Sequence, residues 1–366
     1  MLGGGQLGRM FVTAARTMGY NVIVLDPDIN SPAGGLASEH LTKAYDDTEA
    51  LDYLAQRCAV VSTEFENVPA ATLDYLAQSV PVHPSAKALQ VAQHRRREKD
   101  FFRELGLGTA AFVAIESTAD LEQAREFPFP AILKTATLGY DGKGQIVCEH
   151  FDELDSAFAQ VGGKPCVLEQ RVDLACEVSV VLGRTQRGEI ACFPIAENSH
   201  ANGILDVTLV PASISAEFAE TAIDAASRIA DGLDYCGVLA IEFFVTTDDQ
   251  VLVNEMAPRP HNSGHYTLDA CDTSQFEQQV RMICGLPPGS CRLHTPVAMW
   301  NVLGDIWPQG DEPNWGGLLD LPQAKLHLYG KREARPGRKM GHINCLGDSS
   351  NDALDLMRQV RDLLIP

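Results

Sequence analysis

The chain has 366 residues, of which 45% are hydrophobic and 21% are charged. This length exceeds that of a typical single domain, so we expect a soluble globular protein of two or three domains. The formal net charge of −20 argues against a nonspecific nucleic-acid binder and against a protein of the membrane surface. Anionic substrates must therefore meet local basic clusters, for which residues 93–99 and 330–339 are candidates.

Cysteine usage and hydropathy indicate the compartment. Ten cysteines are scattered without a C-x-x-C pair and lie mostly in apolar runs, as expected of reduced core residues and not of a zinc site or disulfide framework. No stretch approaches the ~20 apolar residues of a membrane span, and no signal segment is evident. We expect a cytoplasmic protein with no membrane or nucleic-acid partner.

The first predicted element is a glycine turn that leads into an amphipathic helix and then a strand, over residues 3–28. Gly3, Gly5 and Gly8 have G-x-G-x-x-G spacing, and the strand ends at Asp26. This pattern indicates half of a doubly wound nucleotide-binding fold. It leaves a dinucleotide-dependent oxidoreductase open.

A glycine-rich loop follows the next predicted elements. Residues 59–65 read as a strand and 85–105 as a helix, and we place the first domain boundary at residue 98. The strand-like AILK then ends at Lys134 and leads to GYDGKGQ, residues 139–145. Glycines let backbone amides approach phosphate oxygens, and lysines supply positive charge. The sequence lacks the P-loop pattern, so the segment is either a phosphate-binding loop of another kind or a flexible hairpin tip.

The run VLEQRVDLACEVSVV, residues 167–181, predicts a strand, a polar connector and a second strand. The connector begins at Glu169 and ends at Asp173, and the second strand carries Glu177. Such a connector suits hydrogen bonding to an adenine edge, and a nearby carboxylate suits ribose hydroxyls. Taken singly, both glutamates are also typical solubilising residues at strand ends.

Two glutamates, Glu242 and Glu255, interrupt apolar runs that predict buried strands. An unpaired carboxylate is costly there, so each is expected either to become neutral or to meet a cation. The polar turn TTDDQ, residues 246–250, would join two antiparallel strands and bring both carboxylates onto one face. Magnesium commonly takes one or two protein carboxylates plus substrate phosphates. The alternative is a pair of salt bridges to arginines such as Arg259.

The segment GLPPGS, residues 285–290, marks the last predicted break. We therefore expect an N-terminal domain over 1–98, a second domain over 99–290 and a C-terminal domain over 291–366. Within the second domain, residues 109–176 suit a small mobile lid that carries the glycine-rich loop.

These motifs, in this order, resemble the ATP-grasp superfamily, and within it the 5-(carboxyamino)imidazole ribonucleotide synthase family of purine biosynthesis. The resemblance covers nearly the whole chain and includes two motifs specific to that family, APRPHNSGH and RPGRKMGH. It also rests on GGGQLGRM, TEFENVP, GYDGKGQ, EVSVV and ENSHANGI. The resemblance implies an α/β ATP-grasp fold with an N-terminal Rossmann-like pre-ATP-grasp domain and a small C-terminal α+β domain.

The resemblance also implies an activity: a carbon–nitrogen ligase that carboxylates aminoimidazole ribonucleotide with bicarbonate. ATP would be converted to ADP and phosphate through carboxyphosphate, with Mg²⁺ as the metal. A cytoplasmic homodimer is implied as well.

The resemblance assigns roles to individual positions. The implied magnesium ligands are Glu242 and Glu255, and the implied catalytic residues are Arg259, His261 and Lys339. The implied ATP contacts are Arg95, Lys134, Gly139, Tyr140, Asp141, Gly142, Lys143, Gly144, Gln145, Glu169, Gln170, Arg171, Val172, Glu177, His200, Asn254 and Glu255. The implied substrate contacts are Gln6, Leu7, Glu66 (with Glu64 as its alternative), Tyr140, Asn262, Arg338 and Lys339. Leu138 stands where the family often has glycine, which bears on how freely the lid hinges.

Three other functions compete with this reading. A different ATP-grasp ligase, for instance a formyl or amino-acid ligase, would share the magnesium glutamates, and a product assay separates it. A dinucleotide-dependent oxidoreductase would bind NAD. A non-catalytic nucleotide-binding regulator would bind ATP without bicarbonate-dependent release of ADP.

Overall fold

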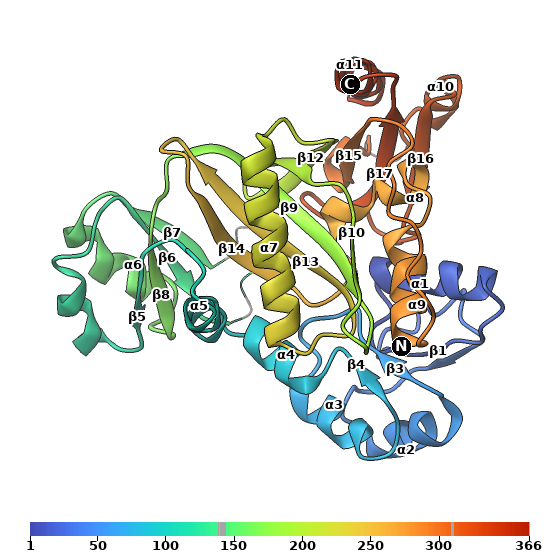
Figure 1. Cartoon of the computed structure of the whole chain (residues 1–366), viewed down its shortest axis with the longest axis horizontal. Coiled ribbons are helices and arrows are strands. Elements are labelled where there is room, and N and C mark those ends of the chain that lie inside the picture. The colour runs from blue at the N-terminus through green and yellow to red at the C-terminus, as the bar shows by residue number, and fades with distance from the viewer. Residues whose placement is uncertain (138, 140–143, 309–310, 366) are drawn as a thin grey trace.

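The computed structural model describes residues 1–137, 139, 144–308 and 311–365. Figure 1 shows three regions: an N-terminal region at the lower right, a small sheet at the left that corresponds to the predicted lid, and a large central sheet that continues into the C-terminal segment at the upper right. The predicted α/β organisation is confirmed.

The N-terminal region forms around the glycine turn as predicted. The first helix begins at Gln6, directly after the turn, and buries Leu7, Phe11 and Val12 along one face. Leu2 bridges in parallel to Leu25 and Thr63 and so links the two small parallel sheets. The elements are α1 (Gln6–Thr17), β1 (Ile23–Leu25), β2 (Glu39–Leu41), α2 (Thr48–Arg57), β3 (Val61–Ser62), α3 (Ala70–Ala77), β4 (Val82–His83) and α4 (Ala86–Ala92).

The single helix predicted over residues 85–105 is wrong: α4 ends at Ala92, and α5 (Arg95–Glu104) begins after a break. His94 at the break has extended backbone geometry, φ −137° and ψ 107°. The Gln93 side chain holds the break by donating to the carbonyl oxygens of Glu66 and Val68, 2.6 and 2.8 Å away. A long-range contact therefore overrides the local helical pattern.

The lid is a four-stranded antiparallel sheet in the order β5-β8-β6-β7. Strand alternation gives it two different faces. Ala131 and Leu133 are buried in a cluster with helix α6, whereas Lys134 extends toward the opposite side. The elements are β5 (Phe112–Ile115), β6 (Ala131–Thr135), β7 (Gln145–Cys148), α6 (Leu154–Gln160) and β8 (Cys166–Gln170).

The central sheet has nine strands in the order β14-β13-β9-β11-β12-β15-β17-β16, with β10 paired to β9. Helix α7 crosses one face (Figure 1), where it packs on residues such as Val180 and Ile241. The elements are β9 (Leu174–Arg184), β10 (Ile190–Cys192), β11 (Ala196–Ala201), β12 (Ile204–Val210), α7 (Ala216–Gly232), β13 (Gly237–Thr246), β14 (Val251–Ala257), α8 (Thr267–Ala270), α9 (Gln275–Ile283), β15 (Val297–Leu303), α10 (Trp315–Leu319), β16 (Ala324–Leu328), β17 (Lys339–Leu346) and α11 (Ser350–Leu364).

Because β15, β16 and β17 extend the same sheet as β9 and β13, the C-terminal segment is joined to the rest by continuous strand pairing. The face opposite α7 carries the polar residues of the site described next. The domain boundaries at residues 98 and 290 and the lid limits 109–176 stay predictions.

Candidate functional site

Two glutamates face each other in the central sheet. Glu242 on β13 lies directly opposite Glu255 on β14 in an antiparallel pair, as the sequence predicted, and the register shifts immediately beyond Glu242. Opposed residues of such a pair share one face of the sheet, where two like charges repel. The bulge leaves Asn254 without a cross-strand partner, and bulges commonly re-aim side chains next to active sites.

The two carboxyl groups titrate differently. Burial, together with the negative charge of Glu255, raises the pKa of Glu242 to about 8. Burial alone would raise the pKa of Glu255 as well, but Arg95 and Lys134 outweigh it and lower that pKa. Arg95 Nη1 lies 3.1 Å from Glu255 Oε2. One glutamate therefore has a cation partner already, and the other lacks one strong enough to keep it ionised.

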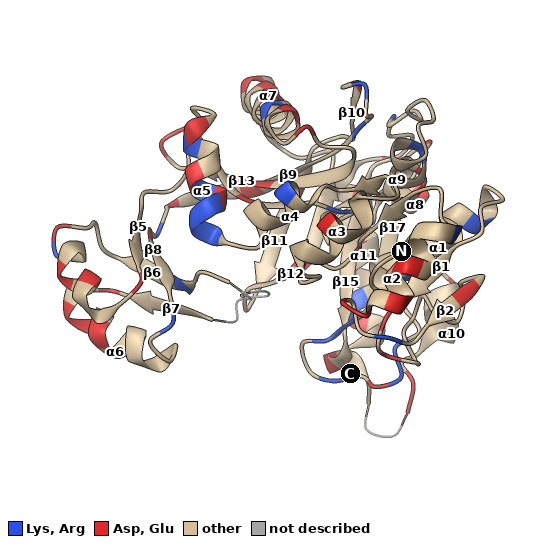
Figure 2. Ribbon diagram, turned by 90° about the horizontal axis from the view of Figure 1, so that it is seen from below, with Lys and Arg blue, Asp and Glu red and all other residues tan. Residues whose placement is uncertain are grey.

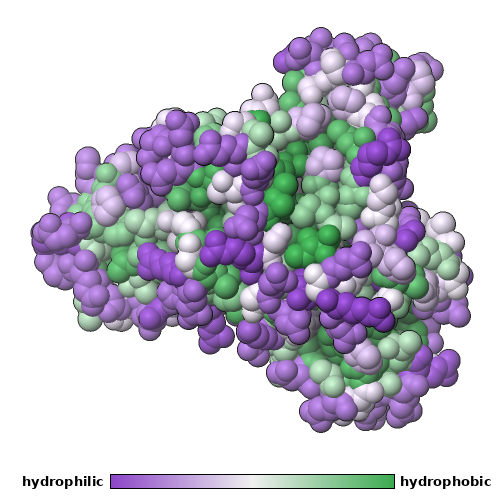
Figure 3. Space-filling view, viewed as in Figure 1, coloured by the Kyte–Doolittle hydropathy of each residue, from purple (hydrophilic) through white to green (hydrophobic). Residues whose placement is uncertain are grey.

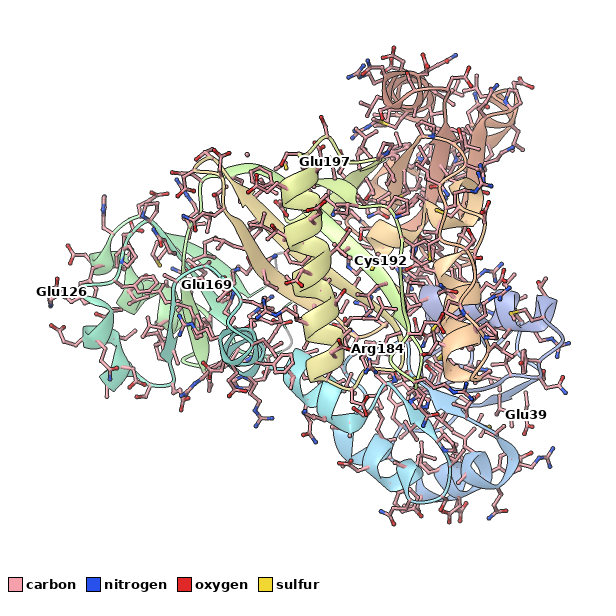
Figure 4. The ribbon with its side chains drawn as sticks, in the orientation of Figure 1. Glu39, Glu126, Glu169, Arg184, Cys192 and Glu197 are labelled. Carbon is pink, nitrogen blue, oxygen red and sulfur yellow. The ribbon has the colours of Figure 1, made fainter. Side chains whose placement is uncertain are left out.

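A second cluster lies where the lid meets α5. Lys134 Nζ on β6 and Lys99 Nζ on α5 lie 2.9 and 3.2 Å from Glu169 Oε2 on β8, and all three side chains are no more than 8% exposed. These cations lower the pKa of Glu169 against the effect of its burial. Its other oxygen, Oε1, is buried without a hydrogen-bond partner among the described residues. Figure 4 labels Glu169 on the lid near α5.

The strand, connector and second strand predicted over residues 167–181 are present, with β8 ending at Gln170 and β9 beginning at Leu174. The backbone N–H groups of Gln170 and Arg171 donate to the carbonyls of Ala111 and Pro130, at 2.9 and 3.0 Å. The amides of Val172 and Asp173 make no backbone hydrogen bond within the part of the chain that the structure describes.

Glu177 and His200 form a further pair on β9 and β11. Glu177 Oε2 lies 3.1 Å from His200 Nδ1. Burial lowers the pKa of His200, but the contact with Glu177 outweighs it and raises that pKa. Glu177 and Glu242 lie on the same face of the sheet. Glu177 is two residues from Ser179 on β9, so the two share a face, and Ser179 lies opposite Glu242.

The glycine-rich loop is described only at its ends. Gly144 has a φ of +72°, and a Cβ there would lie 2.6 Å from Thr135 Oγ1, so only glycine fits. Gln145 begins β7, opposite Lys134. Gly139 lies within the described residues, but no hydrogen bond or close contact found there tests its predicted role in ATP binding. The predictions for Leu138, Tyr140, Asp141, Gly142 and Lys143 lie outside the described residues.

Arg259 and His261 lie next to the glutamate pair. Arg259 Nη2 lies 2.7 Å from Glu66 Oε1, and His261 Nε2 lies 3.5 Å from Glu242 Oε1. Burial and the charges of Arg259 and Lys339 lower the pKa of His261 well below its usual value, so its ring is neutral. The residues predicted to hold bicarbonate therefore border those predicted to hold magnesium.

Basic residues of the C-terminal segment lie on the same side of the site as Arg259 and His261. Lys339, the first residue of β17, is close enough to influence the titration of Glu242. Lys331 Nζ donates to Gln6 Oε1 and to the Lys339 carbonyl oxygen. Arg338 Nη1 donates to the Glu333 carbonyl oxygen, at 2.9 Å, and so stabilises the turn before β17.

Two predicted substrate contacts differ in what they offer. Both side-chain amide atoms of Asn262 are buried and lack partners among the described residues, which suits a ligand-facing role. The Leu7 side chain instead packs in the N-terminal core and is 7% exposed. Only its backbone is available to a substrate.

Glu64 occupies the position that a dinucleotide phosphate would need. Its Oε1 and Oε2 accept from the N–H groups of Gly5 and Gly8, at 2.6 and 3.0 Å. These amides at the start of α1 are the groups that bind a phosphate in a dinucleotide fold. The oxidoreductase alternative therefore lacks its anion site. Because Glu64 is committed here, Glu66 is the glutamate that reaches Arg259.

Charges converge on this region of an acidic protein. Figure 2 shows the basic residues of α5 beside an acidic segment of β13. Within the described residues, no group of three or more His, Cys, Asp or Glu side chains is arranged to hold a metal ion. A pair of carboxylates alone leaves the remaining coordination positions to water and phosphate oxygens, as magnesium prefers.

Comparison with known proteins identifies the family. Family models match a ribonucleotide synthetase preATP-grasp domain at residues 1–93, an ATP-grasp domain at 100–276 and a phosphoribosylaminoimidazole carboxylase C-terminal domain at 297–355. N5-carboxyaminoimidazole ribonucleotide synthase of Bacillus subtilis is 43% identical over 94% of this chain and 90% of that protein. This chain belongs to the N5-carboxyaminoimidazole ribonucleotide synthase family.

Solved structures of the family agree. The synthetase from Thermus thermophilus superposes with a TM-score of 0.92 at 39% identity, covering 100% of this chain and 98% of that one. The Aspergillus clavatus synthase, in complex with ADP and 5-aminoimidazole ribonucleotide, gives a TM-score of 0.90 at 30% identity, covering 99% and 97%. The ATP-grasp fold with its pre-ATP-grasp and C-terminal domains is thus confirmed, as is the resemblance read from the sequence.

Sequence reasoning missed Glu98, and it did not predict the partners of Lys99 and Lys331. Glu98 is buried, accepts from the Met256 N–H at 2.8 Å, and has a pKa raised to about 8 by burial and by Glu255. Lys99 shares Glu169 with Lys134. Its position one helical turn beyond Arg95 was a usable signal. Lys331 lies in the predicted basic cluster 330–339, but only the fold brings it to Gln6.

Proposed function

We propose that this protein carboxylates the exocyclic amine of 5-aminoimidazole ribonucleotide with bicarbonate and ATP, giving 5-(carboxyamino)imidazole ribonucleotide, ADP and phosphate. The family to which the chain belongs supports this reaction. The single observation that carries it is the contact of His261 with Glu242, at 3.5 Å. That contact places His261, proposed to orient bicarbonate, beside Glu242, proposed to hold magnesium on the ATP phosphates.

The first step activates bicarbonate. A bicarbonate oxygen attacks the γ-phosphorus of ATP, the bond to the β-phosphate oxygen breaks, and carboxyphosphate and ADP result. Lys134 and the amides at the ends of the glycine-rich loop would stabilise charge on the phosphoryl oxygens. Arg259 presents a planar fork that suits two oxygens of bicarbonate. His261 and Lys339 would orient the anion.

Magnesium fits the glutamate pair. Glu242 and Glu255 supply hard oxygen ligands on one face, and their mutual repulsion is relieved by a divalent cation. Bound there, Mg²⁺ would neutralise charge on the nucleotide phosphates. Arg95, already beside Glu255, would support the same phosphates. Glu169, Val172, Glu177 and His200 would hold the adenosine part.

The second step forms the carbon–nitrogen bond. The exocyclic amine attacks the carboxyl carbon of carboxyphosphate, or carbon dioxide released from it, phosphate leaves, and the nitrogen loses a proton. Gln6, Asn262 and Arg338 are the proposed contacts for the ribonucleotide, and Glu66 is the carboxylate nearest to Arg259 for its amine. Closure of the lid would exclude water, which otherwise hydrolyses carboxyphosphate.

Phosphate release with ATP and bicarbonate, measured with and without 5-aminoimidazole ribonucleotide, tests the proposal. We expect release that depends on bicarbonate, together with formation of the carboxylated product. Turnover that requires formate or an amino acid instead would indicate a different ATP-grasp ligase. Tight ATP binding without turnover would indicate a regulator.

A homodimer is the proposed assembly. Besides the family resemblance, an open groove of about 640 Å³ supports it, lined mainly by apolar side chains of the β10 segment and of α7. Figure 3 shows a hydrophobic hollow beside α7. Residues that line the groove include Cys192, Phe193, Ile195, Ile214, Ala219 and Ile223. Light scattering should give twice the chain mass, and Ala219→Arg should reduce it to the monomer mass if this groove is the interface.

A cytoplasmic location is also proposed. All ten cysteines are free thiols, which suits a reducing compartment. Among the described residues, no helix is both long enough and apolar enough to cross a bilayer. Fractionation of cells that express the full chain would test the location.

A further inference from the structure

A row of polar side chains crosses the central sheet on the face that carries the glutamate pair. Thr208 on β12 lies opposite Asn198 on β11, and Ser179 on β9 lies opposite Glu242 on β13. Opposed residues share a sheet face. Thr208, Asn198 and Ser179 are no more than 7% exposed. The proposed reaction does not use these three buried groups.

Hydrogen bonds connect this row to His261. Thr208 Oγ1 donates to Asn198 Oδ1 at 2.9 Å, and Asn198 Nδ2 donates to Ser179 Oγ at 3.0 Å. Ser179 Oγ donates to Ser263 Oγ at 2.8 Å, and Ser263 Oγ lies 2.9 Å from His261 Nδ1. The chain is continuous from β12 to the imidazole. The four residues that lead to His261 are buried, so an unmade bond among them would leave a costly unpaired polar group.

The direction of the chain follows from its donors. The Ser263 backbone N–H, which can only donate, points at His261 Nδ1 from 3.3 Å. The Asn198 amide donates to Ser179, so the single Ser179 proton is left for Ser263, and the Ser263 proton for Nδ1. Nδ1 is therefore an acceptor. Because Nδ1 accepts, the ring carries its proton on Nε2, the nitrogen 3.5 Å from Glu242 Oε1.

We propose that Ser263, Ser179 and Asn198 are positioning residues that hold His261 as its Nε2–H tautomer, so that the ring presents a hydrogen-bond donor to the bound anion. This inference rests on the proposed function, which places bicarbonate and carboxyphosphate beside His261. A donor attracts an anionic oxygen, whereas the lone pair of the other tautomer repels it. The other tautomer would also oppose the Ser263 N–H. The hydrogen-bond chain therefore lets residues on β9 and β11 control which His261 nitrogen faces the anion.

The tautomer can be measured directly by ¹⁵N NMR of the His261 ring in the full-length protein without ligands. We expect the parent protein to show Nε2–H. Asn198→Asp keeps the shape but replaces the donor by an acceptor, so Ser179 would turn its proton toward the new carboxylate and stop donating to Ser263. The tautomer population should then shift toward Nδ1–H. Ser263→Ala, which removes the last hydroxyl without adding charge, should shift it in the same direction.

Kinetics supply the second readout. Ser263→Ala should lower kcat/KM for bicarbonate on the order of 10-fold, the scale seen when a residue that orients an active group is removed. The KM for ATP should stay within about twofold, and Ser263→Thr, which restores a hydroxyl, should recover most of the activity. Ser62→Ala is the matched control. Ser62 is also buried and accepts a hydrogen bond from Gln279, but it does not belong to the hydrogen-bond chain that leads to His261.

Two results would overturn the inference. One is an Nδ1–H tautomer in the parent protein, and the other is an unchanged tautomer in both Ser263→Ala and Asn198→Asp. Failure of the proposed function gives a different result: the parent would release no bicarbonate-dependent phosphate, while the NMR spectra would still decide the tautomer.

Discussion

Arg259 and Glu66 form an ion pair between the central sheet segment and the N-terminal region, with Arg259 Nη2 2.7 Å from Glu66 Oε1. Arg259 Nη1 also donates to the carbonyl oxygen of Pro260, at 3.0 Å. The guanidinium is thereby held in place beside the site while remaining 21% exposed. In the proposed reaction, bicarbonate would compete with Glu66 for the Arg259 guanidinium.

The Arg259→Lys variant should lose carboxylation and retain ATP binding. A lysine keeps the charge but cannot hold two oxygens in the plane of a fork, so the anion loses its orientation. We expect product formation to fall by about 100-fold or more. ATP affinity, measured by calorimetry, should stay within about twofold because Arg259 is proposed to bind bicarbonate and not the nucleotide.

His261→Ala provides the comparison. It should also reduce product formation while ATP still binds. A parallel loss of ATP affinity in both variants would place these residues in the nucleotide site. Full activity in both would remove them from the mechanism altogether.

The glutamate pair should be required for turnover. Glu255→Gln removes the charge that Arg95 contacts and that the proposed magnesium ion would need, so turnover should fall by at least about 100-fold with the fold retained in circular dichroism spectra. Glu197→Gln is the matched control, since Glu197 lies on β11 with its carboxylate on the Ser213 amide. Turnover of Glu255→Gln within twofold of the parent would disprove the metal role.

Much of this site could be predicted because its chemistry is local in sequence. Glu242 and Glu255 each interrupt an apolar strand, and the turn between them fixes their pairing, so the opposed geometry followed from the pattern alone. The glycine turn before α1 was equally readable. Its partner was not: Glu64 fills the anion position through a contact across more than fifty residues.

The contacts that the sequence did not predict share that long-range origin. The break between α4 and α5 depends on Gln93 reaching residues 66 and 68. Lys331 reaches Gln6 across almost the entire chain. Periodicity and propensity report on neighbours in sequence, and tertiary contacts of this kind override them.

Gly144 should tolerate no side chain. Gly144→Ala would strain a left-handed backbone and press a methyl group against Thr135 Oγ1 at the end of β6, one residue from Lys134. We expect a higher KM for ATP, by about tenfold, measured in steady-state assays. Gly19→Ala is the control: its φ is also positive, at +86°, but no atom lies within 4 Å of the added Cβ. An equal rise of the KM for ATP in both variants would mean that backbone strain alone, and not the contact with Thr135, causes the effect.

The pH dependence of stability should report the buried glutamates when Mg²⁺ and ATP are absent. The pKa of Glu242 rises from 4.5 to about 8 on folding, and that of Glu98 rises similarly. The folded state therefore binds more protons than the unfolded state between these values. The stabilisation is fully present below pH 4.5 and is lost as the pH rises through 8, at up to about 1.4 kcal/mol per pH unit for each proton.

Denaturant unfolding between about pH 5 and pH 8.5 measures this slope. Glu242→Gln cannot ionise, so its free energy of unfolding should fall less steeply with pH than that of the parent. The free energy of unfolding should depend least on pH in the double variant Glu98→Gln with Glu242→Gln, because neither position can then bind a proton on folding. Exposed Glu104→Gln serves as the control and should keep the parent slope. Parallel slopes in the parent and in Glu242→Gln would mean that Glu242 ionises in the folded protein as easily as in the unfolded chain, contrary to its burial beside Glu255.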